Sequence, residues 1–277
     1  MFDRFSRSWE MVKASAAVLR SDRELMLFPV LSGLATLLVL ATFALPTLAL
    51  RLFSDGFGVT GALLGFAFYF CTYSVMIFFN CALVGAAMIR LDGGDPTLSD
   101  GLAAARARLG AIFGYAAIAA TVGVLLQAMK GKDNNFLVRL VGSGLGMAWT
   151  LATFLVVPVL VSRDIGPVDA LKQSVALLKR TWGENAVGQL GIGAAFGVLT
   201  TIAVLVSLAL VFVAAQASWV LAVVVGVVCG IGVLVLGVYQ AALTGIYSAV
   251  LYRYAVTQEL PPSFRGTDIA HAFAPKR

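Results

Sequence analysis

Six runs of apolar residues dominate the 277-residue chain, and each is long enough to cross a lipid bilayer. A transmembrane helix needs about 20 apolar residues, because the hydrocarbon core is about 30 Å thick and a helix rises about 1.5 Å per residue. The sequence therefore predicts an all-α membrane protein with six transmembrane helices. The expected spans cover residues 27–50, 59–89, 111–129, 136–161, 186–214 and 220–252.

The composition leaves no room for a separate soluble domain. Of the residues, 60% are hydrophobic and 12% are charged, whereas soluble domains average about 45–50% apolar and about 25% charged residues. We expect residues 1–260 to form one transmembrane domain and residues 261–277 to form an irregular cytoplasmic tail. No small-residue cleavage site follows a short apolar core, so the first span is expected to act as an uncleaved signal anchor.

An amphipathic stretch at 167–183 lies between two of the spans. Its apolar residues recur every three or four positions, which places them on one helix face: Val168, Leu171, Val175, Leu178 and Trp182. Gly166 followed by Pro167 suits a helix start, because proline at the first helical position sacrifices no needed N–H group. The short length and basic face predict a helix that lies in the membrane interface.

Two other stretches resemble this one. Residues 12–20 align without gaps to residues 171–179, and the alignment pairs Lys13 with Lys172, Ser15 with Ser174, Ala17 with Ala176 and Leu19 with Leu178. A weaker echo begins with Asp95-Pro96 as N-cap and first turn, and its stripe is Leu98, Leu102, Ala105, Leu109 and Ile112. We interpret the three as a threefold repeat of interfacial helix plus hairpin. The alternative is that basic amphipathic helices resemble one another by composition.

Basic residues set the expected orientation. The N-terminal segment, the loops 90–110 and 161–186 and the C-terminal tail together hold 16 of the 20 Lys and Arg residues. Since cytoplasmic loops are enriched in Lys and Arg, both termini are predicted to be cytoplasmic. We expect a multi-pass protein of the bacterial plasma (inner) membrane.

The basic cytoplasmic stretches form a candidate surface for anionic lipid or a partner protein. Its members are Trp9, Lys13, Arg20, Arg106, Arg108, Lys172, Lys179, Arg180 and Trp182. The leading functional hypothesis is therefore a non-enzymatic membrane scaffold or accessory protein. Expected partners are membrane lipids, a protein partner or a second copy of the chain. The net charge of +6 is attributed to lipid headgroups and not to nucleic acid.

The spans contain few polar residues. No Asp, Glu, Lys or His lies in the middle of a span, and ion-coupled transporters usually need such groups along their pathway. Asn80, Gln127, Tyr239 and Gln240 are the candidates for lining a cavity, although a hydrogen bond between helices is the commoner role. They support an alternative function, a transporter or channel for a neutral or lipidic molecule.

Motifs for catalysis are missing from the sequence. It has no phosphate-binding glycine loop, no HExxH zinc spacing and no Gly-x-Ser-x-Gly elbow. The only histidine, His271, has no nucleophile beside it, and the three cysteines lie in apolar runs without paired spacing. The sequence predicts no catalytic residue, no cofactor and no metal site, so we expect a protein that is not an enzyme.

Several short motifs carry a resemblance over nearly the full length: Phe5-Ser6-Arg7-Ser8-Trp9 with Phe28-Pro29, Asp95-Pro96, Gly166-Pro167 with Ala170-Leu171-Lys172, Thr181-Trp182-Gly183, and Leu251-Tyr252-Arg253-Tyr254-Ala255. With these motifs the chain resembles a family of prokaryotic six-span membrane proteins known only as a domain of unknown function. Its layout is also similar to the membrane-anchor domain of some glycerophosphodiester phosphodiesterases, although no phosphodiesterase residues are present. The resemblance implies topology and a bacterial-type plasma membrane, and no activity.

Overall fold

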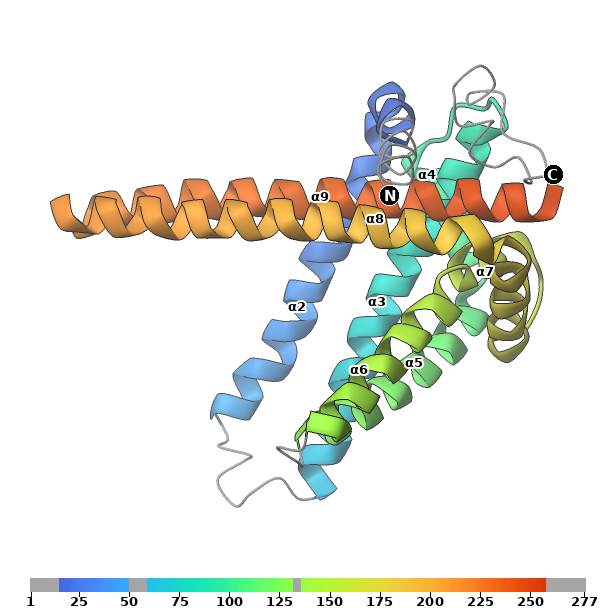
Figure 1. The fold of residues 1–277 in the computed structure, drawn as a ribbon, viewed down its shortest axis with the longest axis horizontal. Helices are drawn as coiled ribbons and strands as arrows, with labels where there is room; N and C mark the ends of the chain where they lie inside the picture. Colours follow the sequence, from blue (N-terminus) through green and yellow to red (C-terminus); the bar gives the residue numbers. More distant parts are fainter. Residues whose placement is uncertain (1–14, 50–58, 132–135, 258–277) are drawn as a thin grey trace.

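The computed structural model describes residues 15–49, 59–131 and 136–257, and the regular structure within these ranges is helical. Six of the helices are long and apolar enough to cross a membrane, as predicted. A helical turn at 15–21 precedes the first named element. The elements are η1 (Arg23–Met26), α2 (Leu27–Ala49), α3 (Val59–Leu91), α4 (Leu98–Arg106), α5 (Leu109–Gly131), α6 (Phe136–Thr153), α7 (Val156–Ser162), α8 (Pro167–Ala217) and α9 (Trp219–Thr257) (Figure 1).

The candidate spans follow two directions. Helices α8 and α9 run side by side as a long hairpin, and this hairpin crosses α2 and α3 instead of running along them (Figure 1). With 51 and 39 residues, α8 and α9 are about 76 Å and about 58 Å long. Helices of this length suit a crossing that is strongly tilted from the membrane normal. Helices α2, α5 and α6 have 23, 23 and 18 residues, and these lengths suit a crossing closer to the normal.

The fourth predicted span, 136–161, is broken near Pro158, where the sequence predicts a kink. Helix α6 ends at Thr153, and α7 begins at Val156 after a short turn. Proline has no N–H group to donate to the carbonyl of Phe154 four residues earlier, and its ring crowds that carbonyl. The two helices together still provide the length of one span. Pro46 acts differently, since α2 continues past it to Ala49.

Ser174 of α8 satisfies the backbone groups that the break leaves open. Its hydroxyl donates a 2.7 Å hydrogen bond to the carbonyl of Ala152 and accepts a 3.1 Å bond from the N–H of Leu155. Ser174 is fully buried. One side chain therefore holds both sides of the α6–α7 turn against α8.

The third amphipathic stretch is not a separate helix. It was expected to end near Gly183, before a span at 186–214, but α8 runs unbroken from Pro167 to Ala217. Gly166 is the N-cap and Pro167 opens the helix, as predicted. The predicted apolar stripe is rotated relative to the buried face, because Val168 is exposed while Ala170, Ser174, Leu177 and Leu178 are buried. Gly183 therefore does not end this helix.

The second stretch is shorter than expected. Its N-cap is Thr97 and not Asp95, and Thr97 forms a capping box with Asp100. Helix α4 ends at Arg106, so Leu109 and Ile112 of the predicted stripe belong to α5. The buried face of α4, at Gly101 and Ala105, packs on protein: a side chain at Gly101 would meet Phe28 and the backbone of Ala82 in α3.

Burial agrees with the repeat between the first and third stretches. Over the six positions 15–20 and 174–179, each residue has the same degree of burial as its predicted equivalent. Ser15 and Ser174 are buried, as are Leu19 and Leu178, and Ala17 and Ala176 are exposed. The weaker second echo matches less well, because only its first position in this window, Ala105, is buried.

The packed core lies at one end of the helices. It combines the second half of α3, Ala105 of α4, the first part of α5, most of α7, the start of α8 and the end of α9, with Leu19, Leu25 and Phe28 from the N-terminal part. Away from this core, α8 and α9 expose many large apolar side chains, including Val198, Phe212 and Val224. In a bilayer these side chains are the surface that lipid would contact.

Candidate binding cavity

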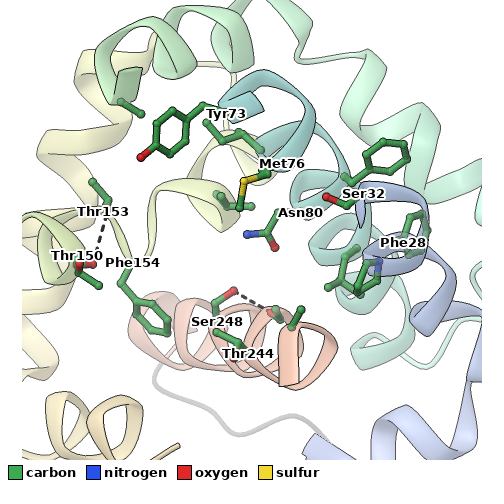
Figure 2. A pocket seen from close by; sticks show the side chains of 18 of the residues that line it. Phe28, Ser32, Tyr73, Met76, Asn80, Thr150, Thr153, Phe154, Thr244 and Ser248 are labelled. Carbon is green, nitrogen blue, oxygen red and sulfur yellow. Dashed lines mark hydrogen bonds between the residues drawn. The ribbon is translucent and has the colours of Figure 1, made fainter. Parts of the chain in front are cut away.

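A cavity of about 630 Å³ adjoins the packed core. Residues of α2, α3, α5, α6, α7 and α9 line it (Figure 2). Apart from α7, which contributes Val157 alone, each of these helices contributes residues three or four positions apart, such as Tyr73, Met76 and Asn80 on α3. Helical periodicity therefore gives α3 and its neighbours one inward face each.

Small residues leave the space on the α9 side. Gly237 and Ala241 lie one turn apart along the lining face of α9, and Gly245 follows another turn later. At Gly245 a side chain would press on Leu83 and come within 3.5 Å of the Asn80 side-chain oxygen. Helices α3 and α9 thus meet closely at Gly245 and diverge along the cavity, where Gly237 has no neighbour within 4 Å of an added Cβ.

The lining is polar in places and carries no formal charge among the described residues. Phe28, Ile77, Leu83, Phe154 and Val157 give it a large apolar share. Polar side chains come from Ser32, Tyr73, Asn80, Tyr115, Thr150, Thr153, Gln240, Thr244 and Ser248. In Figure 2 Asn80 reaches into the space that faces Thr244 and Ser248. This combination suits a neutral molecule with both polar and apolar parts.

Four of the lining hydroxyls donate to their own helices. Thr150 donates to Gly146 at 2.9 Å, and Thr153 donates to Trp149 at 2.8 Å. On α9, Thr244 donates to the carbonyl of Gln240 at 2.9 Å, and Ser248 donates to that of Gly245 at 2.8 Å. Such bonds let a hydroxyl sit in an apolar helix without an unsatisfied proton.

The four predicted intramembrane polar residues have three different outcomes. Asn80 and Gln240 both line the cavity, from α3 and α9. Tyr239 instead packs against Phe196 of α8, with ring centroids 6.5 Å apart. The side chain of Gln127 lies outside the described part of the structure. The polar lining residues that the sequence analysis missed are mostly hydroxyl-bearing residues. On α9, the spacing of four between Gln240, Thr244 and Ser248 is the signal that could have found two of them.

The predicted basic surface is partly neutralised by carboxylates. Arg108 pairs with Asp164, and Lys172 pairs with Asp169 at 3.3 Å. Two further cations at the same loops are also paired, Arg90 with Asp95 at 3.3 Å and Arg253 with Asp92. Arg20, Arg106 and Lys179 are exposed. Trp9, Lys13 and the side chains of Arg180 and Trp182 lie outside the described residues, as do the tail 261–277 and the beginning of the first stretch, 12–14.

Comparison with known proteins gives a family match. Residues 59–260 match the sequence profile of a family described as a family of unknown function (DUF6159). No curated protein matches the chain. The layout similarity to phosphodiesterase membrane anchors therefore stays a prediction.

Proposed function

The chain belongs to the DUF6159 family of unknown function, and from its own geometry we propose that it binds a neutral amphiphilic molecule in its intramembrane cavity. The role is that of a non-enzymatic carrier or channel for such a molecule. The observation that carries the proposal is the lining contributed by α2, α3, α5, α6 and α9, which is polar in places and carries no charge among its described residues.

Size and chemistry both support this proposal. Small-molecule sites are typically about 300–1,000 Å³ and mostly apolar, with a few polar groups that fix orientation, and this cavity of about 630 Å³ fits that description. A charged ligand would lack a counter-ion among the described lining residues, and burying an unpaired charge is costly. A neutral headgroup on an apolar chain can use Asn80, Gln240 and the apolar wall together.

Filling the cavity tests the proposal. Ala241→Phe places a ring in the space from the α9 side, and Ala215→Phe adds the same ring at an exposed position of α8 as the control. The full chain, purified in native nanodiscs, would be analysed by mass spectrometry for molecules enriched over the surrounding membrane. We expect Ala241→Phe to lose an enriched neutral molecule that Ala215→Phe retains. An unchanged profile in Ala241→Phe would contradict the proposal.

A scaffold role through the basic surface is the second candidate, supported by the exposed side chains of Arg20, Arg106 and Lys179. Neutralising all three to Gln should release a bound anionic lipid or partner protein. Lys172→Gln is the matched control, because Asp169 already compensates that charge. If the triple variant keeps every association of the wild-type protein, the surface does not serve this role.

A further inference from the structure

The hydrogen bonds that the cavity hydroxyls already make indicate which kind of ligand the cavity prefers. This inference rests on the function proposed above. We infer that the cavity selects a headgroup that donates hydrogen bonds, such as the hydroxyls of a neutral glycerolipid or lipid alcohol. A headgroup that can only accept hydrogen bonds, such as an ether, an ester or a phosphate with its charge, would be disfavoured.

The preference follows from where the hydroxyl protons of the cavity lining go. A serine or threonine hydroxyl has one proton to donate and two lone pairs that accept. Thr150, Thr244 and Ser248 each donate that proton to a carbonyl of their own helix. Toward the cavity these three oxygens can offer lone pairs only.

Thr153 extends the acceptor set. Its proton also goes to its own helix, to the carbonyl of Trp149 at 2.8 Å. We therefore assign the acceptor character of the lining to Thr150 and Thr153 on α6 and to Thr244 and Ser248 on α9. These residues come from two of the helices that enclose the space (Figure 2).

The rest of the lining is mixed. The amides of Asn80 on α3 and of Gln240, one turn before Thr244 on α9, offer both donors and acceptors, as do the hydroxyls of Ser32, Tyr73 and Tyr115. These groups can pair with either kind of headgroup, so the preference comes from the hydroxyls that are bonded to their own helices. There a ligand hydroxyl finds an acceptor, whereas a ligand oxygen without a proton meets lone pairs. In a site of low dielectric, this difference is larger than it would be in water.

Three probes of equal chain length separate these cases. They are 1-monooleoylglycerol, its 2,3-di-O-methyl ether and 1-oleoyl lysophosphatidic acid, and their equilibrium binding would be measured on the full chain in nanodiscs. We expect monooleoylglycerol to bind about tenfold tighter than its ether, from the loss of one or two hydrogen bonds, and tighter than the anion.

Variants localise the preference. The double variant Thr244→Val and Ser248→Ala should reduce the preference for monooleoylglycerol over its ether toward equality. Thr201→Val is the matched control, because Thr201 donates the same kind of bond to Gly197 at 2.8 Å but lies on α8, outside the cavity lining. It should leave the preference unchanged.

The outcomes distinguish this inference from the proposed function. If the alcohol and the ether bind equally and Ala241→Phe abolishes both, the cavity binds amphiphiles and the donor preference is overturned. Tighter binding of the anion at the same Ala241-sensitive site also overturns it. If no probe binds in an Ala241-sensitive manner, the proposed function fails together with the inference.

Discussion

A methyl group added to Gly85 would lie 2.8 Å from the Cβ of Ala104, so α3 and α4 approach each other with no space between them at this pair. The Ala104 Cβ has no rotamer by which it could move aside. Gly85 is buried in the packed core beside Val84 and Ala86. The position of α4, which the sequence assigned to the membrane interface, is thus determined by contact with protein.

Replacement of Gly85 by Ala should therefore destabilise the protein. Overpacking of a tight core costs about 1–3 kcal/mol, and the midpoint of thermal unfolding in detergent should fall accordingly. Gly65→Ala in the same helix is the control, since nothing lies within 4 Å of its added Cβ. Equal midpoints for the two variants would contradict the close contact.

Removal of the Ser174 hydroxyl should destabilise the α6–α7 turn. Ser174→Ala leaves the carbonyl of Ala152 and the N–H of Leu155 without their partner, and an unsatisfied buried group costs about 1–3 kcal/mol. The free energy of unfolding would be compared with that of Ser207→Ala, which removes a hydroxyl bonded only to Ala203 of its own helix. The Ser174 variant should lose clearly more stability.

Acid should weaken the start of α4. The backbone N–H and the hydroxyl of Thr97 bond the Asp100 carboxylate at 2.9 Å and 2.7 Å, and these bonds lower the pKa of Asp100 below its ordinary value of 3.8. Because the folded pKa is depressed, the contribution is complete above the unfolded pKa and disappears as pH falls through the folded pKa. The stability difference between wild type and Asp100→Asn should therefore shrink as the pH falls from about 5 toward 3. A difference independent of pH would contradict the role of the ionised cap.

The orientation inferred from basic residues can be tested by cysteine labelling. In a background without Cys71, Cys81 and Cys229, Ser218→Cys at the α8–α9 turn should react with a membrane-impermeant maleimide in intact cells. Ser99→Cys on α4 should react only after permeabilisation, because its loop lies on the side rich in Lys and Arg. The reverse pattern would place both termini outside the cytoplasm.

The existence of six spans could be predicted from sequence because their signal is local. Runs such as 59–89 and 220–252 agree with α3 and α9 to within a few residues. Pro158 predicted a kink, and the fourth span is interrupted close to it. The continuity of α8 could not be predicted in this way. Gly183 and the charged residues before it suggested an end, but the helix continues because neither glycine nor charge forbids helical backbone.

The candidate site was predicted only in part, because cavity lining depends on which helices meet. Asn80 and Gln240 stood out as amides in apolar runs, and both line the cavity. Tyr239, next to Gln240, faces the neighbouring α8 instead, since adjacent helical positions point about 100° apart. Hydroxyls such as Thr244 gave a weak signal, because the same residue types also bond their own helix at lipid-facing positions, as Thr42 does on α2.

The two hydrogen bonds between Ser174 and the α6–α7 turn also have a consequence for biogenesis. Ala152 and Leu155 leave the ribosome about twenty residues before Ser174, whose side chain bonds the Ala152 carbonyl and the Leu155 N–H. A backbone group without a hydrogen-bond partner in hydrocarbon costs several kcal/mol. The α6–α7 turn can therefore settle at its final depth only after the beginning of α8 has been translated. Until then, we expect the hairpin of α5 and α6–α7 to remain in contact with water at the insertion machinery. In terms of the predicted repeat, the helix that begins the third unit completes the folding of the second unit.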